Sequence, residues 1–206
     1  RIFAAGLSGS IEHAMSWTFR TSNENGGGGA ATTVAVTVTG MAAHDVIVVG
    51  VGTGDAIDVS SVDDTGSAYT ARALNTAQTN TRCKFFYKLD NDKAGSVTYT
   101  ATYASAATAR EIHVWAFTPV GTPSFDVDRT DAGSGAGAGT AIDTGAITTT
   151  AADEVVVTFC YHSVGTTLSS QQINGVAADG TLDPGGNATS FYRIVSGTFT
   201  GNGTCT

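Results

Sequence analysis

The sequence predicts an all-β protein, and three observations carry this prediction. β-Branched Thr and Val are abundant, whereas Leu and Lys, which favour helices, occur only five and three times. Val34, Val36 and Val38 alternate with polar neighbours, as in a half-buried strand. No window of about 12 residues shows the apolar spacing of an amphipathic helix. We therefore expect short antiparallel strands arranged as a jelly-roll-like β-sandwich.

The first half of the chain contains several expected strands separated by turn residues. A weak alternation over residues 11–21 predicts a first strand, and the glycine-rich residues 23–30 predict a flexible loop. The nearly continuous apolar run at residues 46–51 is typical of a central strand that is buried on both faces. Further strands are expected at residues 34–38, 57–62, 68–74, 82–89, 97–103 and 112–120.

The second half repeats phrases of the first, which predicts an internal pseudo-duplication. Residues 43–49 recur as residues 151–157, and Phe86-Tyr87-Lys88 recurs as Phe191-Tyr192-Arg193. Strands are expected at residues 141–149, 154–161, 166–175, 189–194 and 197–201. The strand at residues 112–120 has no counterpart in the second half, so we expect a vacant sheet edge there. The residues of this possible strand-pairing edge are Gly197, Thr198, Phe199 and Thr200.

The domain organisation follows from the position of the glycine-rich stretches. We expect residues 1–31 to form an N-terminal strand and a flexible loop, and residues 32–206 to form a single β-sandwich. Residues 133–139 (GSGAGAG) read either as a mobile surface loop or as a linker. The alternative is therefore two halves that divide near residues 133–139.

Charge and cysteine content limit the classes of partner. The net charge of −8 argues against nucleic-acid binding, which needs a basic surface. No apolar run approaches the roughly 20 residues that span a bilayer, so we expect no membrane partner. Cys83, Cys160 and Cys205 are an odd number and lie far apart in sequence, which suits free thiols in a protein folded in a reducing cytoplasm. Whether any two of them pair stays open at this point.

Several phrases together resemble a known class of module. These phrases specify turns and core positions. They are the apolar run of residues 45–51, Val62-Asp63-x-x-Gly66-x-x-Tyr69-Thr70, Phe85-Phe86-Tyr87-Lys88, residues 94–98, Arg110 with residues 116–120, and Phe125-Asp126. Over residues 32–200 the chain resembles the Thr/Gly-rich β-sandwich modules of tailed-phage virion proteins and large bacterial surface proteins. The resemblance implies a structural role, as a capsid decoration or a head or tail fibre protein, or a role in adhesion. It also implies assembly in the host cytoplasm with capsid or tail proteins and further copies of the chain as partners.

The residue pattern predicts no catalytic site. The Asp90-Asn91-Asp92 stretch begins like an EF-hand loop but has Ala101 where a bidentate Glu is needed, so it predicts a hairpin turn. Cys160 and His162 share a strand face but lack an orienting third group. We expect a non-enzymatic protein without a cofactor. A structural calcium ion remains the alternative for two groups of loop carboxylates, Asp126, Asp128 and Asp131, and Asp55, Asp58, Asp63 and Asp64.

Carbohydrate binding is the second functional hypothesis. Sandwich lectins stack sugars on exposed aromatic rings, and Trp17 is the tryptophan that we expect to be exposed. Trp115 lies in a strongly apolar strand and is expected in the core. The alternative function is therefore an adhesion module of a virion fibre or of a bacterial cell surface, with Trp17 as a glycan contact.

Overall fold

The computed structural model describes residues 16–72, 80–126, 142–162, 168–183 and 186–206. Within these ranges the regular structure is β-strand without any helix, and hence without one that is long and apolar enough to cross a membrane. Every strand pairing is antiparallel. The prediction of an all-β fold built from antiparallel sheets is confirmed, and the jelly-roll connectivity stays a prediction.

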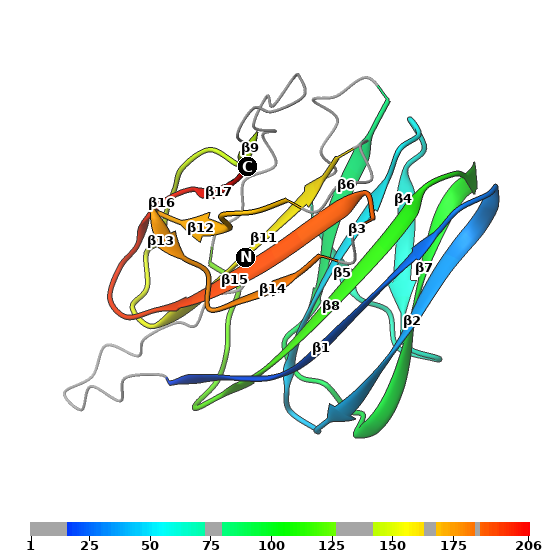
Figure 1. The fold of residues 1–206 in the computed structure, drawn as a ribbon. Coiled ribbons are helices and arrows are strands. Elements are labelled where there is room, and N and C mark those ends of the chain that lie inside the picture. The colour runs from blue at the N-terminus through cyan, green and yellow to red at the C-terminus, as the bar shows by residue number, and fades with distance from the viewer. Residues whose placement is uncertain (1–15, 73–79, 127–141, 163–167, 184–185) are drawn as a thin grey trace.

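The strands form sheets that lie in layers (Figure 1). The central sheet has the order β1 (Trp17–Gly27), β8 (Arg110–Pro119), β3 (Val46–Thr53), β6 (Arg82–Lys88), β5 (Thr70–Ala71). The outer sheet has the order β2 (Ala31–Met41), β7 (Gly95–Ala107), β4 (Val59–Asp63). The third sheet has the order β11 (Glu154–Tyr161), β15 (Ala188–Val195), β14 (Gly180–Leu182).

Two small sheets complete the described structure. One has the order β13 (Val176–Ala177), β12 (Gln172–Ile173), β17 (Gly203–Cys205), β9 (Ile142–Asp143). The other pairs β10 (Ile147–Thr148) with β16 (Thr200–Gly201). In the described residues, each sheet takes all its strands from one side of residues 127–141. Residues 1–15 of the expected N-terminal region and the stretch 133–139 lie outside the described residues, so the choice between one sandwich and two halves stays a prediction.

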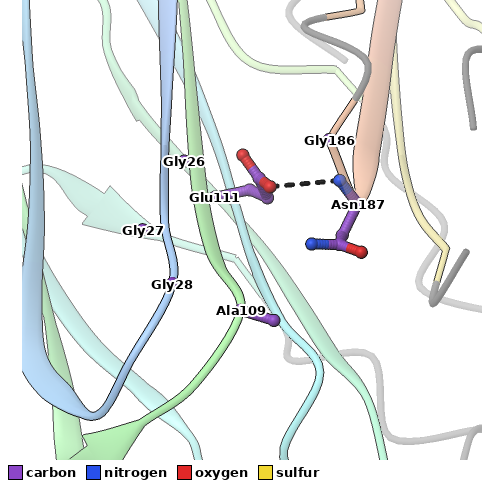
Figure 2. Close-up of a pocket in the computed structure, with 7 residues that line it drawn as sticks. All are labelled: Gly26, Gly27, Gly28, Ala109, Glu111, Gly186 and Asn187. Carbon is purple, nitrogen blue, oxygen red and sulfur yellow. Dashed lines mark hydrogen bonds between the residues drawn. The ribbon is translucent and has the colours of Figure 1, made fainter. Parts of the chain in front are cut away.

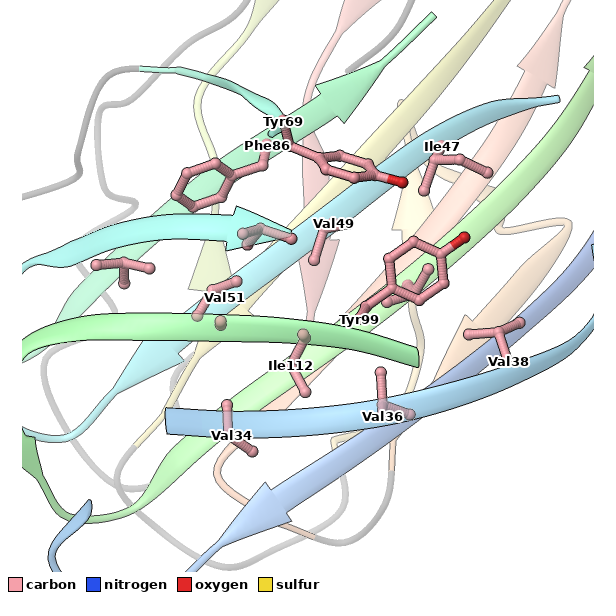
Figure 3. Packing of buried hydrophobic residues seen from close by; sticks show 14 of the residues in the cluster. Val34, Val36, Val38, Ile47, Val49, Val51, Tyr69, Phe86, Tyr99 and Ile112 are labelled. Carbon is pink, nitrogen blue, oxygen red and sulfur yellow. The ribbon is translucent and has the colours of Figure 1, made fainter. Parts of the chain in front are cut away.

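Buried side chains fill the space between successive layers. The largest cluster lies between the outer and central sheets and is dominated by valines, with Tyr69, Phe86 and Tyr99 among them (Figure 3). A second cluster, rich in aromatic rings, lies between the central and third sheets. A third joins the third sheet to the small sheets and includes Ile173, Phe191 and Cys160. The central and third sheets are thus each covered on both faces, and for β3 this is the burial that its apolar run predicts.

The third sheet approaches the central sheet closely because β3 carries glycines at alternate positions. A Cβ atom on Gly50 or Gly52 would meet the ring of Phe159 or Tyr161 on β11, and one on Gly54, just after β3, would meet the hydroxyl of Tyr161. At Gly52, for example, it would lie 2.6 Å from Tyr161 Cδ2. The alternation of valine and glycine over residues 49–52 therefore sends Val49 and Val51 to the outer core and leaves space for aromatic rings on the other face.

The repeated phrases correspond to two strand pairs with related register. Val48 lies opposite Tyr87 in β3–β6, and Val157 lies opposite Tyr192 in β11–β15. The strand pairing therefore matches residue 48 with residue 157, whereas the sequence repeat of residues 43–49 and 151–157 matches residue 48 with residue 156. Matched by strand pairing, His44 corresponds to Asp153, and both have positive φ. Each precedes a buried acidic residue, Asp45 or Glu154, at the start of its strand pair.

Two local expectations are wrong. Residues 23–27 were expected in a flexible loop but continue β1 and pair with β8. Gly26 and Gly27 are needed there for packing, because a Cβ atom would lie 2.5 Å from Glu111 and 2.7 Å from Arg110, respectively. The expected hairpin turn after residue 88 instead connects β6 in the central sheet with β7 in the outer sheet, and the amide of Asn91 holds this crossing by donating to the carbonyl oxygens of Ala42 and Lys93.

Candidate functional site

A polar cluster lies between the central and third sheets, at the end of β8 opposite Trp115 and Phe117. β8 contributes Glu111 and His113, which point to the same face because they are two residues apart. The third-sheet side contributes Asn187, the residue before β15, and Ser190, near the start of β15. Glu24 of β1 pairs with His113 and adds a second carboxyl group. These five residues are called the polar cluster below.

Glu111 is the most constrained acidic group of the cluster. Its side chain is only 3% exposed, and its Oε1 atom accepts a hydrogen bond from the backbone N–H of Asn187 at 3.1 Å (Figure 2). Its Oε2 atom is buried against Gly26 without a hydrogen-bond partner among the described residues. Burial raises the pKa of Glu111, and the neighbouring Glu24 raises it further. The group therefore holds its proton to higher pH than an ordinary glutamate.

His113 and Ser190 form a buried hydrogen-bonded link between the two sheets. Ser190 Oγ lies 2.8 Å from His113 Nδ1 and 2.9 Å from Trp115 Nε1. Since the indole N–H can only donate, the serine hydroxyl accepts from Trp115. The direction of its second hydrogen bond, with His113 Nδ1, follows from the tautomer of the imidazole. Burial, followed by the nearby His162, lowers the pKa of His113 to about 3, so the imidazole stays neutral. His113 and Ser190 are 0% and 1% exposed, so the serine hydroxyl lies away from solvent.

A cavity of about 340 Å³ opens beside Glu111 (Figure 2). Its walls are formed by small residues, main chain and two polar side chains, namely Gly26, Gly27, Gly28, Ala109, Glu111, Gly186 and Asn187. Glu111 is the one ionisable side chain among these lining residues. The cavity thus offers hydrogen-bonding groups for a small polar ligand and lacks, among its lining residues, a nucleophile positioned next to a base.

Trp17 occupies a position unlike the expected one. The ring is 5% exposed, its N–H donates to the carbonyl oxygen of Asp153 at 2.8 Å, and it belongs to the aromatic cluster with Trp115, Phe117 and Tyr192. The expectation that Trp17 is exposed is therefore wrong. The reason is that β1 adds to the edge of the central sheet and directs this ring toward the third sheet, where other rings cover it.

The expected strand-pairing edge is largely occupied within the chain. The carbonyl oxygen of Phe199 accepts from the N–H of Thr149, and the N–H of Phe199 donates to Thr149 Oγ1, both at 2.8 Å. Thr200 pairs with Thr148 in the two-stranded sheet β10–β16. Gly197, with φ of +79°, and Thr198 lie in the turn before these residues. Residues 147–149 therefore supply hydrogen bonds that we expected from a partner.

The loop carboxylates mostly bind side chains and turns of the chain itself. Asp64 is fully buried, accepts from the hydroxyl of Tyr69 at 3.1 Å, and lies 3.6 Å from Lys88 and 3.7 Å from Lys93. Asp128 and Asp131 lie outside the described residues. In the part of the chain that the structure describes, no three His, Cys, Asp or Glu side chains are placed to hold a metal ion.

Cys160 and His162 have separate partners. Cys160 Sγ lies 3.9 Å from Cys205 Sγ, and His162 Nε2 lies 3.3 Å from Thr189 Oγ1. Both groups are buried. The structure thus assigns Cys160 a neighbour that sequence spacing did not indicate.

The outer face of the outer sheet is a second surface of interest, because its two long strands carry no charged residue. β2 and β7 present short side chains in cross-strand pairs, Thr33 with Thr102, Ala35 with Thr100, and Thr37 with Thr98. The hydroxyls of Thr37 and Thr98 lie 2.8 Å apart. Asp63, opposite Thr100 on β4, is the acidic residue at the margin of this face.

The free edge of β2 is closed by side chains of the central sheet. Asn23 and Asn25 donate to the carbonyl oxygens of Thr37 and Ala35 at 2.8 and 2.7 Å. The guanidinium of Arg110 donates to the carbonyl oxygen of Thr33, two residues further along. Side chains thus satisfy the acceptors that an added strand would need, which protects this edge against pairing with another chain.

Comparison with known proteins returns no match to a family model, to a curated protein or to a solved structure. Sequence reasoning missed Glu111 and His113 as a pair. The signal was present, since a polar residue at every second position of an otherwise apolar strand indicates a face with a different partner.

Proposed function

We propose that this chain is a non-enzymatic structural subunit of a larger assembly, and specifically a capsid decoration or fibre protein of a phage particle. The observation that carries the proposal is the uncharged outer face of β2 and β7. The chain has 18 acidic and 10 basic residues, yet none lies in these two long strands. The resemblance of residues 32–200 to phage virion modules supports the choice of particle.

The charge distribution favours a second copy of this chain as the occupant of the face. Two copies with a net charge of −8 repel each other, and the repulsion is smallest when they meet through a face without charged side chains. Contact at such a face also removes no charged side chain from water. Short threonine and alanine side chains also lose little rotamer entropy on contact. An uncharged face of this kind suits a symmetric contact in which the same patch serves both copies.

Docking by the face also fits the state of the sheet edges. Asn23, Asn25 and Arg110 satisfy carbonyl oxygens of β2, and the Phe199–Thr200 segment is paired within the chain. The proposal therefore relies on side-chain packing across β2 and β7 more than on strand addition at Gly197–Thr200. The burial of Ser190, His113 and Cys160 supports the non-enzymatic part, because their reactive atoms lie away from solvent.

The test measures self-association by sedimentation velocity over a range of concentrations. Thr37→Lys places a positive charge in the middle of the face and is expected to weaken association about tenfold or more. Thr148→Lys is the matched control, because Thr148 is also exposed on a strand and also contacts a threonine hydroxyl, that of Thr200 at 3.1 Å. The control is expected to associate like the unmodified chain.

Two results would contradict the proposal. One is a chain that stays monomeric at every concentration, and the other is equal weakening by both substitutions. Binding of the monomer to a glycan array, unchanged by Thr37→Lys, would instead support the carbohydrate-binding alternative, for which Trp17 no longer provides an exposed ring.

A further inference from the structure

We propose that Cys160 and Cys205 form a disulfide bond when the folded protein meets an oxidising medium. The bond would join the third sheet to the small sheet that contains β17. It is a covalent modification site that does not depend on the surface by which the chain docks.

The two sulfur atoms already lie in contact. Their distance is 3.9 Å, so closure to a disulfide length of about 2.05 Å needs a relative movement of about 2 Å. The cysteines are 45 positions apart in sequence and come from different sheets, which explains why sequence spacing could not pair them.

The surroundings hold both cysteines in place. Cys160 lies within β11, paired with Thr189 of β15, and Cys205 lies in β17, paired with Ile142 of β9. On the other side of β17, the backbones of Thr206 and Ser169 exchange two hydrogen bonds. Both cysteines belong to the apolar cluster between these sheets, so packing holds the two sulfurs next to each other.

The contact also differentiates the two thiols. The hydrogen bond between them lowers the pKa of Cys205 and raises the pKa of Cys160, and burial raises that of Cys160 further. Access decides which of the two thiols reacts first, because a thiolate can attack only an oxidant that reaches it. β17 is a short strand, held by pairings of two residues with β12 and with β9, and its local opening gives an oxidant access to Cys205.

The reaction balances with a small-molecule disulfide, such as oxidised glutathione, as the oxidant. The Cys205 thiolate attacks one sulfur of the oxidant, forms a mixed disulfide and releases one thiol. The Cys160 thiolate then attacks the Cys205 sulfur, forms the protein disulfide and releases the second thiol. The protein loses two protons and two electrons, and the oxidant is reduced to two thiols.

Cys83 provides an internal control. It lies on β6 in the central sheet, whereas Cys160 and Cys205 contact each other between the third sheet and the small sheets. Burial also raises the pKa of Cys83 to about 12. A bond between Cys160 and Cys205 leaves this single cysteine free in the oxidised protein.

The experiment treats the folded chain with oxidised glutathione and, separately, with a reducing agent. Oxidation is expected to lower the intact mass by about 2 Da, the mass of two hydrogen atoms. After denaturation, a thiol-alkylating reagent is expected to label Cys83 alone in the oxidised protein and all three cysteines in the reduced protein. Closing this loop is expected to raise Tm by about 5–10 °C.

Variants separate the proposal from its alternatives. Cys83→Ser is expected to keep both the mass loss and the rise in Tm, and Cys205→Ser is expected to lose both. Alkylation of all three cysteines after long exposure to the oxidant would overturn the proposal, as would a stable glutathione adduct on Cys205 or a bond that includes Cys83. The comparison of oxidised with reduced unmodified protein decides the question even if Cys205→Ser folds poorly.

Discussion

The two faces of β8 are both buried, yet they contact their neighbours through different chemistry. Toward the outer sheet, Ile112, Val114 and Ala116 join a cluster made almost entirely of aliphatic side chains and tyrosines. Toward the third sheet, the chemistry changes along the strand, from the carboxyl of Glu111 and the imidazole of His113 to aromatic rings. One strand therefore contributes to a uniformly apolar core on one side and, on the other, to an interface that changes from polar to aromatic along the strand.

The difference indicates how each interface is specified. Aliphatic side chains fit several relative positions of two sheets at similar cost, whereas hydrogen bonds fit one. The link from Trp115 through Ser190 to His113 fixes the third sheet along β8. At the other end, the ring of Tyr192 lies 5.0 Å from both Trp115 and Phe117, in edge-to-face contact. We infer that the interface between β8 and the third sheet determines the position of the third sheet as well as the stability of the fold.

The largest expected effect comes from truncating each face of β8 in turn. Trp115→Ala is expected to lower the free energy of unfolding by about 3–5 kcal/mol, because it removes a large buried ring and leaves Ser190 without its donor. Ile112→Ala on the opposite face is expected to cost about 2–5 kcal/mol. Urea denaturation followed by circular dichroism measures both.

The same experiment tests whether the two interfaces unfold together. Because β8 contributes to both, we expect a single transition whose midpoint both substitutions lower. Two transitions, with Ile112→Ala acting only on one, would instead favour two halves that unfold separately.

The second prediction concerns acid. His113 has a pKa of about 3 in the folded protein, below the ordinary value near 6.5, so the unfolded chain binds a proton that the folded chain excludes. Its contribution to stability is present above pH 6.5 and is lost as pH falls toward 3, by at most about 1.4 kcal/mol per pH unit. His113→Gln is expected to remove this slope. His44→Gln, at an exposed histidine, is the control, and an unchanged slope in His113→Gln would show that the interface is not the acid-sensitive element.

The third prediction has the opposite sign and concerns Glu154, next to Asp153 at the aromatic end. Burial raises the pKa of Glu154 to about 8, and the neighbouring Asp126 adds to the rise. The folded chain therefore keeps a proton that the unfolded chain releases near pH 4.5, so stability decreases as pH rises from 4.5 to 8. Glu154→Gln is expected to gain about 1–3 kcal/mol relative to the unmodified chain at pH 9. It should gain little at pH 4.5, and equal gains at both pH values would contradict the assignment.

The sequence predicts the core between the central and outer sheets better than the contacts between the central and third sheets. Apolar runs such as residues 46–51 are sufficient to predict a strand covered on both faces, and the structure has β3 fully buried. The position of the third sheet on β8 depends on contacts such as that of Trp17 with Asp153, and the packing of its other face depends on contacts such as that of Cys160 with Cys205. Both contacts join residues far apart in the chain. Composition and periodicity carry no information about which distant segments meet. This is why the fold class followed from the sequence while the buried state of Trp17 did not.

The smallest expected effect lies outside both interfaces, at the edge of β2. Asn25→Ala removes the donor to the carbonyl oxygen of Ala35 and is expected to lower the free energy of unfolding by only about 0.5–1 kcal/mol, because water can replace the bond. Replacing Asn23 as well opens two acceptors of the edge strand, so we expect the double variant to aggregate faster on gentle heating, measured by light scattering. Asn80→Ala, at an exposed loop position, is the control and is expected to change neither quantity. If the double variant aggregates no faster than Asn80→Ala, the asparagines of β1 only position β2 and do not protect its edge.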